Sequence, residues 1–292
     1  MAHKSGFVNI IGNPNVGKST LMNALVGEKL SIITKKTQTT RHRLMGIVNG
    51  EDFQIVYSDT PGIVDPHYKL HEYMMNYIES ALLDADIFLL VTEIGETFAH
   101  EKLLDRIKSS NIPVIVIINK IDQSNQEKVI EAMQWWEKKV PGCEIIPTSA
   151  LSKFNIELAF DTIIKHLPES PAYYSKDQLT DRSERFFVSE IIREKILLFY
   201  KKEIPYSVEV VVDAFKEEKD IIRIIAIIFV ARDTQKAILI GHQGQSLKRV
   251  GTEARKDMEE FFGKKIYLET TVKVNKDWRD KDIHLKRFGY NQ

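Results

Sequence analysis

The sequence of 292 residues has a single cysteine, no long apolar run and no net charge. One cysteine, Cys143, excludes an intrachain disulfide and any cysteine-rich zinc site, so we interpret it as an inert thiol. No apolar run approaches the roughly 18 residues needed to span a bilayer, and residues 1–7 lack the apolar core of a signal peptide. We therefore expect a soluble, intracellular, cytoplasmic protein that is stabilised by burial and hydrogen bonding.

A phosphate-binding loop is the strongest motif of the sequence. The apolar stretch Phe7–Ile11 precedes residues 12–20, which match G-x4-G-K-[ST] at every fixed position, and a helical pattern follows. Glycines let successive backbone N–H groups curl around phosphates, while the positive end of the helix dipole points at them. Lys18 is expected to reach the β- and γ-phosphates and Ser19 to bind Mg²⁺. The predicted phosphate-binding residues are Gly12, Asn13, Asn15, Val16, Gly17, Lys18, Ser19 and Thr20.

Short apolar runs alternate with amphipathic helical patterns along the first half of the chain. This alternation predicts a mainly parallel sheet wrapped by helices, a three-layer α/β fold whose ligands lie at the carboxyl ends of the strands. The sequence is long enough for a second domain as well. The predicted strands are Phe7–Gly12, Leu44–Val48, Phe53–Ser58, Ile87–Thr92, Val114–Asn119 and Glu144–Thr148.

Three further motifs stand where these strands end. In Asp59-Thr60-Pro61-Gly62, Asp59 can hold Mg²⁺ through water and the Gly62 N–H can approach the γ-phosphate. Asn119-Lys120-Ile121-Asp122 selects guanine, because the carboxylate of Asp122 can accept both N1–H and the 2-amino group, which adenine does not offer together. Asn119 can bond N7, and the stem of Lys120 can lie along the ring. Ser149-Ala150 closes the last strand, where the Ala150 N–H can bond guanine O6.

In this order and spacing the four motifs resemble the small GTPase pattern over roughly residues 5–168. The resemblance implies GTP/GDP and Mg²⁺ as ligands, and a switch segment at residues 37–43 in which Thr40 closes onto Mg²⁺ and the γ-phosphate. The implied Mg²⁺ ligands are thus Ser19, Thr40 and Asp59. For the neighbouring Arg41, His42 and Arg43 two interpretations stay open, part of the switch or plain solvated charges, and we assign none of them a catalytic role.

The residue after the D-x-x-G motif is Ile63, where many GTPases place a glutamine that orients the attacking water. An isoleucine cannot polarise water, and the sequence resembles the translation-factor-related GTPases with a hydrophobic residue here, which implies slow intrinsic hydrolysis. In some relatives the residue at the position of Asn15 helps to hold K⁺, so K⁺ is a hypothetical second cation. We expect Lys18, Thr40, Gly62 and Asn15 to support catalysis.

A second domain follows a proline-containing linker. Its patterns predict a helix at Phe186–Tyr200, strands at Tyr206–Phe215 and Ile221–Ala231, a helix at Gln235–Ile240, the tetrapeptide Gly241–Gly244, a helix at Gln245–Phe262 and a strand at Lys265–Val274. That order resembles the bacterial-type, type II KH fold, an α+β domain whose G-x-x-G binds single-stranded RNA. Ile238, Leu239 and Ile240 would meet base faces. The residues predicted to bind RNA are Ile240, Gly241, His242, Gln243, Gly244, Lys236, Lys248, Arg249 and Arg255.

A GTPase domain followed by such a KH domain resembles the Era ribosome-assembly GTPases, with residues 38–43, 204–207 and 251–258 all fitting. The resemblance implies binding to 16S rRNA near its 3′ end during maturation of the small (30S) subunit, timed by GTP, and weak association with the cytoplasmic face of the membrane. We expect a monomer with a GTPase domain at 1–168, a linker at 169–183, a KH domain at 184–280 and a tail at 281–292. Two alternatives stay open: a P-loop kinase acting on a metabolite, and a regulatory GTPase whose second domain binds a protein or membrane partner.

Overall fold

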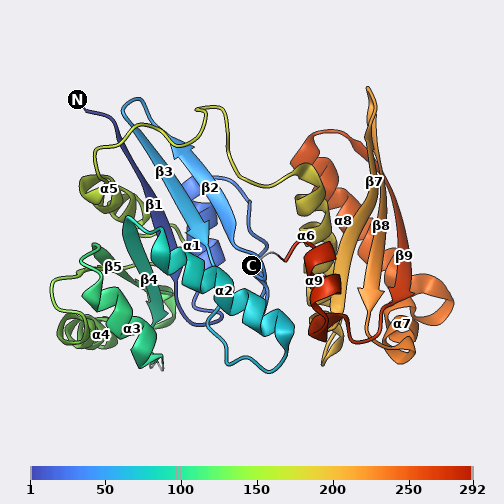
Figure 1. Ribbon diagram of the computed structural model, residues 1–292, viewed down its shortest axis with the longest axis horizontal. Helices are drawn as coiled ribbons and strands as arrows, with labels where there is room; N and C mark the ends of the chain where they lie inside the picture. Colours follow the sequence, from blue (N-terminus) through green and yellow to red (C-terminus); the bar gives the residue numbers. More distant parts are fainter. Residues whose placement is uncertain (1, 97, 99, 291–292) are drawn as a thin grey trace. The chain divides into compact units, whose positions relative to one another are not determined.

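The computed structural model describes residues 2–96, 98 and 100–290, which divide into two compact units (Figure 1). The first unit holds the residues up to Pro66 together with Met74–Asp181. The second holds His67–Tyr73 and the residues from Arg182 onward. Each unit has its own sheet and its own apolar core, so we describe each by itself.

A six-stranded sheet in the order β2-β3-β1-β4-β5-β6 forms the centre of the first unit. All neighbours pair in parallel except β2 and β3, which are antiparallel. The predicted α/β fold is therefore confirmed, and β1 begins earlier than predicted because Lys4 already pairs with Phe53. The strands are β1 (Lys4–Ile11), β2 (Leu44–Asn49), β3 (Phe53–Asp59), β4 (Ile87–Glu93), β5 (Val114–Asn119) and β6 (Glu144–Pro147).

Helices cover both faces of this sheet. On one face Ile78, Leu104 and Trp136, from three successive helices, are buried against apolar residues of β1, β4 and β5. In Figure 1 α2 crosses in front of the strands while α1 lies behind them. The helices are α1 (Lys18–Val26), α2 (Lys69–Leu83), α3 (Glu101–Ser109), α4 (Gln126–Lys139) and α5 (Ile156–His166).

The second unit is built on a three-stranded sheet in the order β7-β8-β9, with β7 and β8 antiparallel and β8 and β9 parallel. Alternate residues of β8, such as Ile222, Ile224 and Ile228, are buried in the core that this sheet shares with its helices. The predicted KH order of elements is thus observed. The elements are α6 (Glu184–Phe199), β7 (Val208–Glu217), β8 (Ile221–Val230), α7 (Asp233–Ile240), α8 (Gln245–Phe262), β9 (Lys265–Val274) and α9 (Asp282–Arg287).

The boundaries of β7 differ from the prediction. Residues Ile204–Tyr206 form a short 3-10 turn that contains Pro205, so the strand begins at Val208 and not at Tyr206. At its other end Lys216 and Glu217 still pair with Arg223 and Ile222, so the strand extends beyond its predicted end at Phe215.

The predicted linker at 169–183 and the predicted tail at 281–292 are each held by specific contacts. Within the first unit the Thr180 hydroxyl donates to the carbonyl of Met45 at 2.7 Å, and the Ile47 N–H donates to the carbonyl of Leu179 at 2.8 Å. Within the second, the buried Tyr290 donates its hydroxyl to Glu209 at 2.9 Å. The domain limits expected from the sequence, at 168, 183 and 280, stay a prediction. None of the helices in the described part of the chain combines the length and apolar character that crossing a membrane requires.

Candidate nucleotide and RNA sites

The loop between β1 and α1 is shaped by glycines that no other residue could replace without a clash. A Cβ at Gly12 would lie 2.2 Å from the carbonyl oxygen of Val91. Gly17 has a φ of 98°, and a Cβ there would lie 2.2 Å from Nδ2 of Asn119. The loop therefore packs closely on the ends of β4 and β5 and leads directly into the N-terminus of α1, where a phosphate-binding loop stands.

Lys18 begins α1 and is buried. Its ammonium donates to the carbonyls of Gly12 and Asn13, each at 2.9 Å, which holds the charge over the loop. Burial lowers the pKa of Lys18 to about 8, and the carboxylates of Asp59 and Glu96 oppose that shift. A cation kept in this position suits phosphate oxygens, which would supply the compensating negative charge.

Oxygen atoms suited to Mg²⁺ converge beside Lys18. The hydroxyl oxygens of Ser19 and Thr40 lie 2.8 Å apart, and Ser19 donates to Oδ2 of Asp59 at 2.6 Å. Octahedral Mg²⁺ with ligands at about 2.1 Å places neighbouring ligands about 3 Å apart, so this pair of hydroxyls fits adjacent positions on the ion. Oδ1 of Asp59 is buried and has no hydrogen-bond partner among the described residues, which leaves it for a metal-bound water.

Asp59 is fully buried at the end of β3. Burial raises the pKa of this carboxyl, and hydrogen bonds from Ser19, Ser31 and Thr40 together with the charge of Lys18 oppose the rise. The D-x-x-G segment also reaches the phosphate loop, because a Cβ at Gly62 would lie 2.8 Å from the Cα of Pro14. The structure thus brings the phosphate loop and the D-x-x-G motif together. Ser19 and Asp59, which are hydrogen-bonded, are 40 positions apart in the sequence.

The residues predicted to bind the base form one cluster at the ends of β5 and β6. Asn119 is buried and donates to the carbonyl of Val16 at 2.8 Å, while its Oδ1 accepts the Ala150 N–H at 3.0 Å. Ser149 donates to Oδ1 of Asp122 at 2.6 Å, which orients that carboxylate. The amide of Asn119 therefore ties the phosphate loop to the Ser149-Ala150 turn.

Lys120 also touches the phosphate loop. It has a left-handed backbone with φ of 60°, its ammonium donates to the carbonyl of Asn15 at 2.5 Å, and it forms an ion pair with Glu93. Val16 is buried, Asn13 and Thr20 are half-buried, and Asn15 is exposed. Contacts of Asn119 and Lys120 therefore join the predicted base site to the phosphate loop at the carboxyl ends of the parallel strands.

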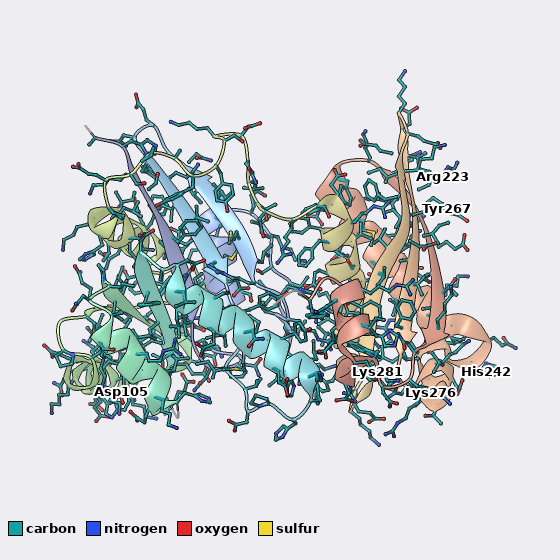
Figure 2. The ribbon with its side chains drawn as sticks, in the orientation of Figure 1. Asp105, Arg223, His242, Tyr267, Lys276 and Lys281 are labelled. Carbon is teal, nitrogen blue, oxygen red and sulfur yellow. The ribbon has the colours of Figure 1, made fainter. Side chains whose placement is uncertain are left out.

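The G-x-x-G of the second unit is a turn between the end of α7 and the start of α8. Gly241 has φ of 72°, Gln243 of 51° and Gly244 of 76°, so three of the four residues have positive φ. A Cβ at Gly241 would lie 2.2 Å from the hydroxyl oxygen of Ser246, whereas a Cβ at Gly244 would meet nothing within 4 Å. His242 is exposed at the outer surface beside α7 (Figure 2).

Side chains around this turn differ in their exposure. Ile238 is 51% exposed and Ile240 is partly buried against the core, but Leu239 is completely buried. The expectation that Leu239 faces a base is therefore wrong, because one step of about 100° around the helix turns it into the core. Lys248 and Arg255 are exposed on α8, and Lys236 is half-buried. Arg249 stacks its guanidinium 4.2 Å from the ring of Phe199, which fixes it on the surface.

Comparison with known proteins matches two family models along the chain. Residues 7–120 match the family described as 50S ribosome-binding GTPase, and residues 203–279 match the KH domain. GTPase Era of Syntrophus aciditrophicus (strain SB) is 48% identical over 293 residues, covering 99% of this chain and 96% of that protein. This chain belongs to the Era family of GTPases. GTPase Era of Clostridium kluyveri is 44% identical over 290 residues, covering 98% of this chain and 99% of that protein.

A solved structure supports the same assignment. The crystal structure of Era in complex with MgGDPNP and nucleotides 1506–1542 of 16S ribosomal RNA has a TM-score of 0.95 and 38% identity, and covers 99% of this chain and 100% of that one. Membership of the Era family makes this chain a GTP-hydrolysing enzyme that uses GTP or GDP with Mg²⁺. When bound, Mg²⁺ would be held by Ser19, Thr40 and Asp59 and would neutralise charge on the phosphates.

One of the two interpretations of the Era-type switch segment is wrong. Arg41, His42 and Arg43 are not solvated charges, since their exposed fractions are 0%, 7% and 7%. The guanidinium of Arg43 donates to Asp84 through two nitrogens, at 2.7 and 2.8 Å. Such charges are buried only when they are paired, and the partner Asp84 lies 41 positions along the chain, where no local pattern indicates it.

Ile63 contributes no polar group to the site. Its side chain is buried in the core beneath α2 and α3, and its N–H lies 3.5 Å from the carbonyl of Gly12. The group that positions water is therefore not this side chain. Ser31 was missed altogether, although its hydroxyl donates to Oδ2 of Asp59 at 2.8 Å.

Proposed function

We propose that this Era-family GTPase binds 16S rRNA near its 3′ end through the G-x-x-G turn and acts as a GTP-timed factor in maturation of the 30S subunit. The observation that supports this most is the turn itself. Three of its four residues have positive φ, it lies between two helix ends, and exposed basic side chains stand beside it on α8. A backbone open in this way lets about four nucleotides approach closely. The Era relative solved with nucleotides 1506–1542 of 16S rRNA supports the choice of RNA.

In this proposal Ile238 and Ile240 contact base faces, while Lys236, Lys248, Arg249 and Arg255 contact phosphates. His242 and Gln243 occupy the two variable positions of the turn and would be the first to influence base preference. The nucleotide is bound by the residues of the four motifs described above, with Asp122 selecting guanine. K⁺ would act at Asn15 as a second cation.

The timing by GTP has a physical basis in the first unit. Strand β2 begins directly after the switch segment, and Met45 in this strand donates its N–H to Asp181 at 3.0 Å. The segment that leads into α6 is therefore bonded to the strand that continues the switch. We propose that ordering of residues 37–43 around GTP acts on this segment and so changes the access of RNA to the turn.

The test is RNA binding by the full-length protein at about 150 mM KCl. The salt concentration is fixed because the affinity that phosphate contacts provide falls as salt rises. The RNA copies nucleotides 1506–1542, and a scrambled RNA of equal length serves for comparison. Gly244→Asp is matched by Gly263→Asp, because both glycines have positive φ, 76° and 63°, have open space around them and lie at opposite ends of α8.

We expect Gly244→Asp to weaken binding about tenfold or more, and Gly263→Asp to change it little. Binding should be tighter with a non-hydrolysable GTP analogue than with GDP. Equal loss in both variants, or equal affinity for the scrambled RNA, would contradict recognition at the turn. No RNA binding in either nucleotide state would favour the alternative of a protein or membrane partner for the second unit.

A further inference from the structure

Ser31 lies in the loop after α1, in none of the nucleotide motifs, yet it contacts the centre of the predicted metal site. Its side chain is buried, with 5% of its surface exposed, and its hydroxyl donates to Oδ2 of Asp59 at 2.8 Å. The two residues are 28 positions apart. A buried hydrogen bond to a carboxylate is among the stronger hydrogen bonds of a protein, so the contact constrains how Asp59 is turned.

The position of Ser31 is itself fixed by α1. Oδ1 of Asn23 accepts the N–H groups of Leu30 and Ser31 at 3.0 and 2.9 Å, and its Nδ2 donates to the carbonyl of Ser31 at 2.7 Å. Asn23 belongs to the same helix that begins with Lys18 and Ser19. The Ser31 hydroxyl is therefore held relative to the phosphate loop before the switch segment begins.

The other two donors to Asp59 have a second task. Ser19 and Thr40 would also hold Mg²⁺, with their oxygen lone pairs directed to the ion, and Thr40 is 3.4 Å from Oδ2. Ser31 has a backbone fixed from α1, and its hydroxyl approaches the same oxygen. Oδ1 then stays directed away from these donors, with no partner in the described part of the chain.

We propose that Ser31 is a positioning residue of the Mg²⁺ centre, which holds Oδ2 of Asp59 so that Oδ1 accepts a hydrogen bond from a metal-bound water. The inference rests on the GTPase activity of the family and is independent of the RNA proposal. It assigns to the loop between α1 and the switch segment a role in metal affinity. It also explains why Asn23, which touches no nucleotide motif, uses three hydrogen bonds to secure Leu30 and Ser31.

The test compares Ser31→Thr with Ser31→Val, because the two side chains have nearly the same volume and differ in a hydroxyl against a methyl group. The readout is dissociation of fluorescently labelled GDP from the full-length protein as a function of free Mg²⁺, together with the rate in excess EDTA. The control is Ser110→Ala, which removes a half-buried hydroxyl that caps α3 in the same unit. Circular dichroism confirms that each variant is folded.

For Ser31→Val we expect a rise of about tenfold in the Mg²⁺ concentration that gives half-maximal slowing of GDP release. A change of this size is expected from the loss of one hydrogen bond to a charged group. The rate in EDTA should stay unchanged, since Ser31 acts only through the metal. Ser31→Thr should stay close to the parent, as should Ser110→Ala. An unchanged Mg²⁺ half-point in Ser31→Val, or equal changes with Mg²⁺ and with EDTA, would overturn the proposal. Equal shifts in the Thr and Val variants would overturn it too, because they would reflect packing.

Discussion

Arg43 and Asp84 form a two-point ion pair, with Nη1 2.7 Å from Oδ2 and Nη2 2.8 Å from Oδ1. The same guanidinium donates from Nε to Ser58 at 2.6 Å and from Nη2 to Asn9 at 3.1 Å. Asp84 lies just beyond the end of α2, so the pair joins the end of the switch segment to the helix that follows the D-x-x-G motif. The contact anchors the end of the switch segment at Arg43.

Arg43→Ala should lower the free energy of unfolding by about 2 kcal/mol, because the Ser58 hydroxyl and Oδ1 of Asn9 each lose the buried guanidinium donor. The loss of free energy is no larger because the Asp84 side chain is 42% exposed, so water can solvate its carboxylate in the variant. Urea unfolding followed by circular dichroism measures the difference.

Arg106→Ala is the matched control for that measurement. Arg106 pairs with Glu79 at 2.6 Å, but both side chains are about half exposed, at 50% and 46%. Such a pair contributes about 0.5 kcal/mol or less. Equal losses in the two variants would show that burial gives Arg43 no special role.

Gly17→Ala should abolish GDP binding, and Gly27→Ala should not. Both glycines flank α1 and have positive φ, 98° and 84°, so both substitutions strain the backbone by about 1 kcal/mol. Only at Gly17 would the new Cβ meet another group, Nδ2 of Asn119 at 2.2 Å, whereas Gly27 has nothing within 4 Å. Isothermal titration with GDP separates the two effects; GDP binding by Gly17→Ala at parental affinity would contradict the role given to Asn119.

The nucleotide site was predictable because its parts are local in sequence. Each motif is a short run directly after an apolar strand, and parallel strands bring their carboxyl ends to one edge of the sheet. Lys18, Asp59 and Asn119 could therefore be placed together without any knowledge of the distances between them. The KH order of elements followed from hydrophobic periodicity for the same reason.

The missed features depend on contacts between distant residues. Arg43 looked like a solvated charge because its partners Asp84 and Asn9 are 41 and 34 positions away. Ser31 had no motif for the same reason, since its partner Asp59 lies 28 positions further on. Leu239 was misassigned because an apolar run does not show which of its members faces the core when every member is apolar. Burial of a polar residue is a tertiary property, and it appears only when the fold is known.

Asp122→Asn should exchange the preferred base. The carboxylate of Asp122 can accept from N1–H and the 2-amino group of guanine, and the loss of two charge-assisted bonds should weaken GDP binding about 100-fold or more. An amide can instead donate to the 2-oxo group of xanthine, so XDP should bind more tightly than GDP. Competition against a fluorescent nucleotide measures both affinities, and undiminished GDP binding would contradict selection of guanine by Asp122.

Ser149→Ala tests how Asp122 is oriented. Ser149 donates to Oδ1 of Asp122 at 2.6 Å and accepts the N–H of Ser152 at 3.3 Å. Its loss should weaken GDP binding about fivefold while the preference for GDP over XDP is kept. A change of preference in this variant would mean that Ser149 itself reads the base.

GTP hydrolysis should slow about tenfold when K⁺ is replaced by Na⁺, an effect of the size expected when one electrostatic contact to the transition state is lost. Asn15 is exposed with a left-handed backbone at φ of 66°, and its carbonyl is fixed by Lys120 at 2.5 Å. In this hypothesis a cation at Asn15 supplies the charge that the buried, apolar side chain of Ile63 does not supply. Asn15→Ala should remove the difference between the two salts in single-turnover hydrolysis while GDP affinity changes less than the rate. A parent enzyme with equal rates in K⁺ and Na⁺ would exclude this cation site and leave the positioning of water to groups of the switch segments.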